Sequence, residues 1–228
     1  MLVILPCAGG SSFNYKKLQF DDSVIIYEYA GHWTRAEDDL DVDFENLVSK
    51  FVDEIAPKLN DGSISLFGHS MGAIVALTSV KLFQRKGIKV HHLYVSACRS
   101  PQMTCEIFKT IMDDDDIIRF LSSVRQVSKK VLNSDFFAEN LLPAIRNDFK
   151  LLKEFSKIHM ESDKVNVPIT CLCGQIDPLV STDDIECWHE YTTSTFEIFV
   201  FPGDHFFVSR KDNRDQIISI IKKDRIVL

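Results

Sequence analysis

The stretch "LFGHSMGA" at residues 66–73 decides the fold, because it joins two kinds of secondary structure around one serine. The run "SISLF" (63–67) before it is typical of a strand, and "MGAIVALTSVKLF" (71–83) after it has apolar residues at helical spacing. Ser70 therefore lies on a strand-to-helix turn between Gly68 and Gly72, which matches the pattern G-x-S-x-G. Such a turn lifts the serine hydroxyl above the sheet, where it is a candidate nucleophile.

Strand-like and helical runs alternate along most of the chain. Strand-like runs occupy residues 2–5, 24–29, 64–67, 93–97, 169–174 and 196–201, and helical patterns cover 44–59 and 73–86. This alternation predicts an α/β fold whose mostly parallel sheet has helices on both faces. The segment at about 103–162 has helical patterns without a strand-like run. We therefore predict one domain over residues 1–228 with a helical insertion at about 103–162.

Composition and charge exclude several classes of protein. The chain has 228 residues, a net charge of −7 and a pI near 5.5, so a phosphate-binding, nucleic-acid-binding surface is not expected. No apolar run reaches the roughly 18–20 residues that span a bilayer, and the start "MLVILPCAGG" lacks the basic residues of a signal peptide. The six cysteines show no metal-binding spacing. We expect a cytoplasmic monomer without a metal or a membrane.

A serine nucleophile needs a base and a carboxylate that orients the base, and both are expected downstream. Asp177 follows an apolar strand in "CGQIDPLVS", and His205 follows the last strand in "FPGDHFF". None of the six other histidines has this position in a turn after a strand. Asp204 adjoins His205, but sequence neighbours rarely orient the same way, so Asp177 is favoured; its alternative role is a helix cap in the "DP" turn. We predict a Ser70, Asp177, His205 triad.

Acyl transfer also needs two backbone N–H groups that stabilise the oxyanion of the transition state. The amide of Met71, directly after the serine, is one candidate. The loop "LPCAGGSS" (5–12) follows the first strand, and its two glycines permit close approach to a ligand. We predict that the Ala8 amide is the second donor. The alternative of a phosphate-binding loop lacks the pattern G-x-x-x-x-G-K-[ST].

Together, these motifs resemble the type II, free-standing thioesterases of nonribosomal peptide and polyketide synthesis. The matching segments occur in family order between about residues 4 and 208: "LPCAGGSS", "YAGH", "FGHSMGA", "SACRSP", "LLPAIRNDF", "CLCGQIDPLV" and "FPGDHFF". The resemblance implies an α/β-hydrolase fold with a helical lid. It also implies hydrolysis of aberrant or stalled acyl thioesters on the phosphopantetheine arm of carrier proteins, with no cofactor of the enzyme's own, and it places the triad and oxyanion hole on the residues already named.

The sequence departs from the family pattern at three positions near the predicted site. Ala30 replaces a usual proline, Ala97 a usual glycine, and Asp204 a frequent glycine. Two alternatives keep the triad: a chain-releasing fatty-acyl thioesterase and an acyltransferase. A third is a carrier-binding protein with an inactive site, which the complete triad disfavours.

Overall fold

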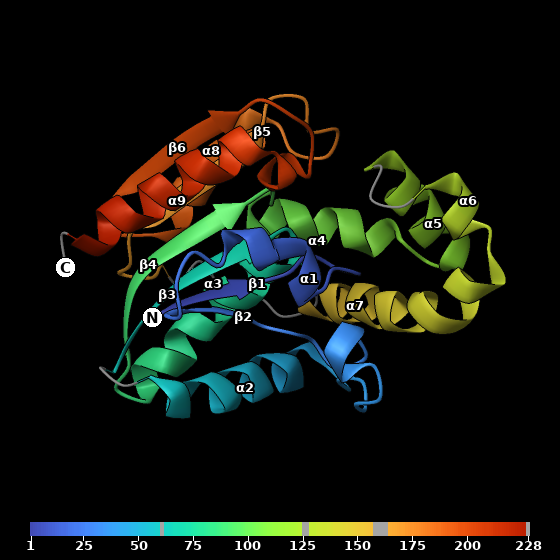
Figure 1. Cartoon of the computed structure of the whole chain (residues 1–228), viewed down its shortest axis with the longest axis horizontal. Coiled ribbons are helices and arrows are strands. Elements are labelled where there is room, and N and C mark those ends of the chain that lie inside the picture. The colour runs from blue at the N-terminus through green and yellow to red at the C-terminus, as the bar shows by residue number, and fades with distance from the viewer. Residues whose placement is uncertain (60–61, 125–127, 157–163, 227–228) are drawn as a thin grey trace.

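Parallel strands form the centre of the molecule in the computed structural model, which describes residues 1–59, 62–124, 128–156 and 164–226 (Figure 1). Within these residues, six strands pair in the order β2-β1-β3-β4-β5-β6, and every pairing is parallel. The strands are β1 (Leu2–Leu5), β2 (Val24–Ile26), β3 (Ser63–His69), β4 (Lys89–Ser96), β5 (Ile169–Gly174) and β6 (Phe196–Phe201). This confirms the predicted parallel α/β sheet.

The side chains of β1 alternate between two hydrophobic clusters, and none of the four is exposed. Val3 and Leu5 join the larger cluster, whereas Leu2 and Ile4 join a second cluster on the opposite face. A strand buried on both faces needs apolar residues at every position, because successive side chains point to opposite sides of the sheet. The continuous apolar run "LVIL" at the start of the chain therefore becomes a central strand.

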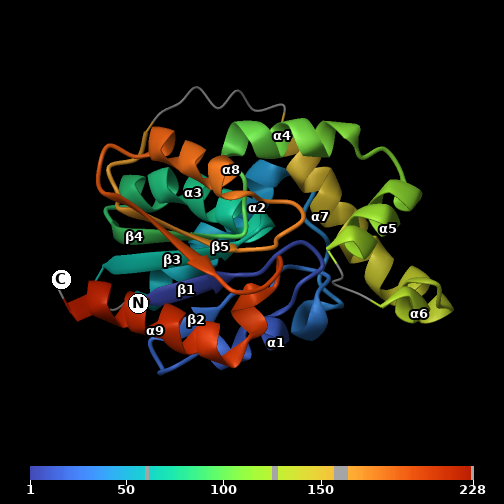
Figure 2. The same ribbon diagram turned by 90° about the horizontal axis from the view of Figure 1, so that it is seen from above.

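Helices cover both faces of the sheet, as predicted (Figure 2). The larger cluster packs beneath α2 (Phe44–Ile55) and α3 (Met71–Arg85), and the second beneath α1 (Ser12–Tyr15) and α9 (Lys211–Ile226). The remaining helical segments outside the insertion are α8 (Thr182–Glu186), η1 (Lys16–Leu18), η2 (Trp33–Arg35), η3 (Ala56–Lys58), η5 (Cys187–Tyr191) and η6 (Phe207–Ser209). None of the described helices is long and apolar enough to cross a membrane.

A helical insertion separates β4 from β5 and extends beyond the end of the sheet (Figure 1). It contains α4 (Pro101–Thr110), α5 (Asp114–Ser123), α6 (Lys129–Leu132), the π-helical turn η4 (Phe137–Leu141) and α7 (Leu142–Phe155). Residues 125–127 and 157–162 of the predicted insertion lie outside the described residues. The described parts are helical; that they act as a lid and belong to a single domain stays a prediction.

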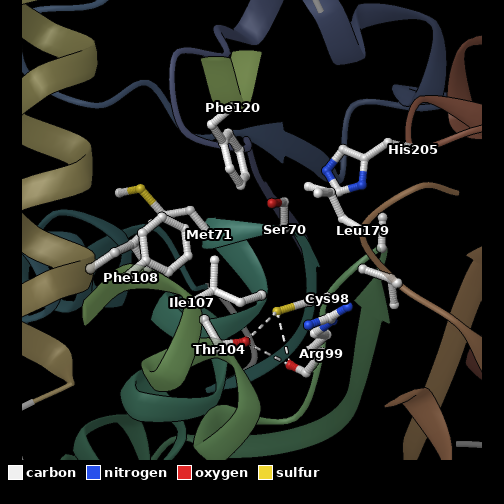
Figure 3. A pocket seen from close by; sticks show the side chains of 13 residues that line it. Ser70, Met71, Cys98, Arg99, Thr104, Ile107, Phe108, Phe120, Leu179 and His205 are labelled. Carbon is white, nitrogen blue, oxygen red and sulfur yellow. Dashed lines mark hydrogen bonds between the residues drawn. The ribbon is translucent and has the colours of Figure 1, made fainter. Parts of the chain in front are cut away.

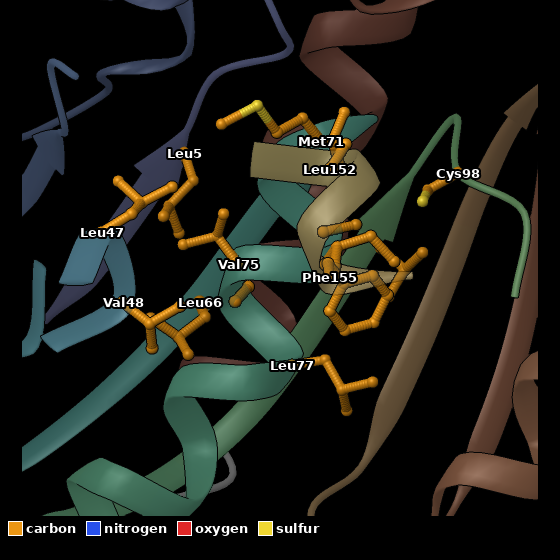
Figure 4. Close-up of a cluster of buried hydrophobic side chains, with 14 of the residues drawn as sticks. Leu5, Leu47, Val48, Leu66, Met71, Val75, Leu77, Cys98, Leu152 and Phe155 are labelled. Atoms are coloured by element: carbon orange, nitrogen blue, oxygen red, sulfur yellow. The ribbon is translucent and has the colours of Figure 1, made fainter. Parts of the chain in front are cut away.

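Helix α7 is attached to the main hydrophobic cluster through its last turns (Figure 4). Leu152 and Phe155 are buried there with Leu66 of β3 and Val75 of α3, and the Phe155 ring centroid lies 5.0 Å from that of Phe44 on α2. The described residues of α7 therefore belong to the same apolar core as the central sheet.

Three strands differ from their predicted lengths, and β3 (Ser63–His69) extends beyond the predicted residues 64–67 at both ends. β2 ends at Ile26 instead of residue 29, because its pairing with β1 ends where Ile26 faces Ile4. β4 begins at Lys89 instead of residue 93, because it pairs along β3 from Ser63 onward. Sheet pairing, which depends on the neighbouring strand, sets these boundaries more than local composition does.

The strand order reverses beside β1, because β2 lies on one side of it and β3 on the other. Loops that leave the carboxyl ends of β1 and β3 therefore diverge, and ligands of open α/β sheets bind in the crevice at such a point. The two loops are residues 6–11, which contain Ala8, and the turn that contains Ser70. The topology thus brings the predicted nucleophile and the predicted oxyanion loop to the same edge of the sheet.

Candidate active site

Ser70 occupies a strained turn between β3 and α3. Its φ of 53° and ψ of −118° lie in a region that L-residues rarely adopt. The turn is held by two backbone hydrogen bonds: the Ser70 N–H donates to the Ser96 carbonyl oxygen at 2.7 Å, and the Ala73 N–H donates to the Ser70 carbonyl oxygen at 2.9 Å. This is the geometry of the nucleophile elbow that G-x-S-x-G predicts.

The two glycines of the motif are explained by close backbone contacts. A Cβ atom at Gly68 would lie 2.3 Å from the carbonyl oxygen of Gly72, and one at Gly72 would lie 2.2 Å from the carbonyl oxygen of Leu5. Neither contact leaves room for a side chain. The start of α3 therefore packs directly against the end of β1, and this contact sets the position of Met71 relative to the loop after β1.

His205 and Asp177 form a buried pair at the ends of β6 and β5. The His205 Nδ1 atom lies 2.8 Å from Asp177 Oδ2, and the two side chains are 4% and 0% exposed. The other carboxylate oxygen of Asp177 accepts a hydrogen bond from the Leu179 N–H at 2.9 Å, which fixes the carboxylate. The structure thus joins the two residues that the sequence analysis paired.

The alternative carboxylate, Asp204, has a different role. Its Oδ1 atom accepts a hydrogen bond from the Phe206 N–H at 3.0 Å and so stabilises the turn that carries His205. This turn lies against the end of β5, because a Cβ atom at Gly174 would be 2.2 Å from the Asp204 carbonyl oxygen. Asp204 therefore supports the position of His205 through the backbone, while Asp177 contacts the ring.

Ser70 and His205 line the same small cavity (Figure 3). It encloses about 30 Å³, and its other walls are mainly apolar. Ile107, Phe108 and Phe120 of the insertion form one side, and Leu179, after β5, lies on the other. A cavity of this volume has room for about one water-sized group, so in this conformation it suits only the part of an acyl group next to the carbonyl carbon.

Cys98 also lines this cavity, but its thiol is a poor competitor as nucleophile. Burial raises the pKa of Cys98 to about 12, although the contact with Thr104 lowers it. Because the thiolate is the reactive form of cysteine, a thiol with so high a pKa stays protonated and unreactive at neutral pH. Ser70 is therefore the better candidate nucleophile.

The predicted oxyanion donors lie on adjoining segments. Met71 is the first residue of α3, where backbone N–H groups carry the positive end of the helix dipole. Ala8 belongs to the loop after β1, in which the Gly10 N–H donates to the Cys7 carbonyl oxygen at 2.9 Å and Gly9 has a φ of 67°. The roles of Ala8, Met71 and the three triad residues stay predictions.

His69 is a site neighbour that the sequence analysis left without a role. It is fully buried, its Nδ1 atom lies 2.9 Å from Ser96 Oγ, and its ring centroid lies 5.3 Å from that of His205. Burial, and to a smaller degree the nearby His205, lowers the pKa of His69 well below its usual range. His69 is thus a neutral packing surface for the His205 ring. The sequence feature that could have indicated this role is the position of His69 at the end of a buried strand, directly before Ser70.

One departure from the family pattern coincides with an unusual backbone conformation. Ala97, where the resemblance leads one to expect glycine, has a φ of 49°. A residue with a Cβ atom pays a steric cost of about 1–2 kcal/mol there. Its neighbour Ser96 supplies the carbonyl oxygen that holds the Ser70 turn, so this strained position lies directly behind the candidate nucleophile.

Among the described residues, no group of three or more His, Cys, Asp or Glu side chains is arranged to bind a metal.

The parallel sheet, the Ser70 elbow and the Asp177–His205 pair at the ends of the strands define a protein of the α/β-hydrolase class. Comparison with known proteins narrows this class. The thioesterase domain model matches residues 1–224, and the chain belongs to this family.

Two of the following three relatives come from named biosynthetic pathways. Thioesterase PikA5 of Streptomyces venezuelae is 29% identical over 216 residues, which cover 91% of this chain and 75% of that protein. The structure of ClbQ from the colibactin NRPS/PKS pathway is 25% identical, with a TM-score of 0.82 over 100% of this chain and 98% of that one. The type II thioesterase BorB from the borrelidin biosynthetic cluster is 26% identical, with a TM-score of 0.79 over 98% and 91%. These relatives confirm the resemblance and the fold class that the sequence predicted.

Proposed function

We propose that this thioesterase is a serine hydrolase that removes aberrant or stalled acyl groups from the phosphopantetheine arm of carrier proteins. The observation that carries the proposal is the buried Asp177–His205 pair beside Ser70 in one apolar cavity. Two of the relatives named above support the assembly-line setting, because one comes from an NRPS/PKS pathway and the other is a type II thioesterase of a biosynthetic cluster. The proposal keeps the expectation of a monomer in the cytoplasm.

The geometry accounts for the first half of the reaction. His205 donates its Nδ1–H to Asp177, so the Nε2 atom carries the lone pair that accepts the Ser70 proton. The serine oxygen then bonds to the thioester carbonyl carbon. The amides of Met71 and Ala8 stabilise the negative charge on the carbonyl oxygen, which is the largest electrostatic contribution to such reactions. The carbon–sulfur bond breaks, and the proton on His205 passes to the departing thiol.

The second half repeats these steps with water. His205 removes a proton from a water molecule, the hydroxide adds to the acyl-enzyme carbonyl, and the Ser70–acyl bond breaks. The proton returns to Ser70, and the products are a free acid and the carrier thiol. The acyl chain occupies the apolar cavity between the insertion and the loop after β5, so Phe108 and Leu179 contact it.

The test compares one acyl group on a phosphopantetheinylated carrier and on a small free thiol. Wild type should prefer the carrier, and Ser70→Ala should lose turnover on both. Ser122→Ala is the matched control, because this hydroxyl bonds the Ile118 carbonyl oxygen within α5 and should not affect turnover. A fluorophosphonate probe should label the wild type and the control but not Ser70→Ala.

The outcomes separate the alternatives. Retained turnover in Ser70→Ala contradicts the mechanism. Equal rates on carrier and free thiol indicate a general thioesterase, and a preference for long fatty-acyl groups indicates a chain-releasing enzyme. An ester or amide product in place of free acid indicates an acyltransferase.

A further inference from the structure

A buried carboxylate links the helical insertion to the loop after β1. Asp148 of α7 accepts a hydrogen bond on Oδ2 from the Gly9 N–H at 2.7 Å. The same oxygen lies 3.0 Å from Nε2 of His32, and the His32 and Asp148 side chains are 6% and 3% exposed. The three residues come from three separate segments, with 139 positions between Gly9 and Asp148. All three lie in segments that carry the family resemblance, but the sequence analysis gave neither His32 nor Asp148 a role in the site.

Hydrogen-bond chemistry assigns a charge to this cluster. The Nδ1 atom of His32 lies 3.1 Å from the Ala30 carbonyl oxygen, which only accepts hydrogen bonds. The ionised Asp148 carboxylate also only accepts, so both ring nitrogens must donate and His32 is an imidazolium. Burial lowers the pKa of His32, but the charge of Asp148 and its hydrogen bond outweigh burial and raise this pKa to about 9. The buried carboxylate is thus compensated by one cation and one amide.

The Gly9 amide adjoins the predicted oxyanion donor. The Gly9 N–H belongs to the Ala8–Gly9 peptide bond, and the Ala8 N–H belongs to the preceding peptide bond, Cys7–Ala8. Other contacts hold the two ends of this loop: the Cys7 N–H donates to the Tyr15 hydroxyl at 3.2 Å, and the Ser12 N–H donates to Glu28 at 3.1 Å. Asp148 holds the middle of the loop, and it does so from the insertion.

We infer that Asp148 is a positioning residue of this thioesterase, which fixes the loop at residues 7–10 so that the Ala8 amide is directed at the oxyanion. This inference rests on the function proposed above. His32 supports Asp148 by neutralising its charge, since a buried carboxylate without a partner is strongly destabilising. Neither residue touches the reacting atoms.

The same contact couples the insertion to catalysis. Helix α7 contributes Leu152 to the cavity wall and Asp148 to the loop. The position of the oxyanion loop therefore depends on α7, the helix that also forms part of the cavity wall.

The test compares Asp148→Ala with Asn147→Ala, its neighbour on the same helix. Asn147 also links α7 to another segment, by donating to the Asp41 carbonyl oxygen at 3.2 Å, but it has no contact with Gly9. With an acetyl thioester of a small thiol, Asp148→Ala should lower kcat about 10- to 100-fold with KM within about threefold, since the oxyanion contact is made in the transition state. Asn147→Ala should keep kcat within about twofold.

A conservative variant separates positioning from general stability. Asp148→Asn keeps a carbonyl oxygen for the Gly9 N–H, so it should retain at least about a third of wild-type kcat. A kcat as low as that of Asp148→Ala would show that the Gly9 hydrogen bond is not the cause. An Asp148→Ala enzyme with reduced thermal stability and unchanged kcat would likewise overturn the inference.

A second design covers an Asp148→Ala variant that fails to fold. His32→Leu/Asp148→Leu replaces the ion pair with apolar side chains of similar size, an exchange that proteins often tolerate. It removes the acceptor for Gly9, so kcat should fall about 10- to 100-fold, and a kcat within about twofold of wild type overturns the inference. Ser70→Ala is measured in parallel: if it stays active, the proposed function has failed; if it is inactive while the double variant is fully active, only this inference has failed.

Discussion

The buried His32–Asp148 pair makes the stability of the protein depend on pH above neutrality. His32 faces Asp148 from α7, Glu28 and the Ala30 carbonyl oxygen from the segment after β2, and the Tyr29 ring at 5.9 Å. Burial lowers its pKa, and the negative groups, Asp148 first among them, raise it to about 9 from the ordinary 6.5. In the unfolded chain His32 returns to the ordinary value.

The sign and size of the effect follow from linkage. Between pH 6.5 and 9 the folded state binds a proton that the unfolded state has released, so the free energy of unfolding falls as pH rises. The contribution is fully present below the unfolded pKa and is lost as pH rises through about 9. At 1.36 kcal/mol per pKa unit, the pair contributes about 3 kcal/mol that disappears across this window.

The measurement is urea denaturation of wild type and His32→Gln at intervals between about pH 6 and 9.5. The glutamine does not titrate, whereas every other ionisable group is common to both proteins, so the difference between the two curves isolates His32. This difference should change by about 3 kcal/mol, beginning near pH 6.5 and levelling off above about pH 9. NMR of the His32 ring measures the folded-state pKa directly. Curves that stay parallel within about 0.5 kcal/mol refute the charged pair.

Three further predictions concern packing around the site. Gly72→Ala forces a Cβ atom to within 2.2 Å of the Leu5 carbonyl oxygen, so it should lower the free energy of unfolding by about 1–3 kcal/mol and kcat about 100-fold. A variant with normal thermal melting and normal turnover would contradict this prediction. Trp188→Phe removes the 2.9 Å hydrogen bond from Nε1–H to the Cys98 carbonyl oxygen, so urea denaturation should show a free energy of unfolding lower by about 2 kcal/mol. A decrease below about 0.5 kcal/mol would mean that the carbonyl group finds another donor. Phe108→Ala enlarges the cavity, so the ratio of kcat/KM for an octanoyl thioester to kcat/KM for an acetyl thioester should rise about tenfold. An unchanged ratio would mean that the acyl chain does not contact Phe108.

Local sequence was enough to predict most of the scaffold. The runs 2–5, 169–174 and 196–201 form β1, β5 and β6 with the predicted bounds, and the glycines around Ser70 place that residue on the predicted turn. Such features depend on side-chain pattern and backbone freedom within a few residues, which the sequence contains directly. The positions of Asp177 and His205 after strands also follow from this local pattern, since parallel strands end at a common edge.

Other features depended on segments that meet only in the folded chain. Asp177 rather than Asp204 contacts His205, because the tight approach at Gly174 places the two loops side by side and turns Asp204 toward its own backbone. The short β2 reflects the extent of its pairing with β1, which its own composition does not indicate.

The sequence by itself determined a parallel α/β sheet, a serine on a strand-to-helix elbow and a short set of candidate partners, because each is a property of local periodicity and steric freedom. Only the tertiary structure decided that Asp148, on a helix of the insertion, bonds Gly9 and pairs with His32. In the sequence these residues lie in three separate segments of the family pattern, and nothing in the sequence indicates that they contact one another. Burial and hydrogen-bond geometry make them a charged cluster. Both the burial and the hydrogen bonds arise only in the folded chain, where the three segments pack around the Asp148 carboxylate.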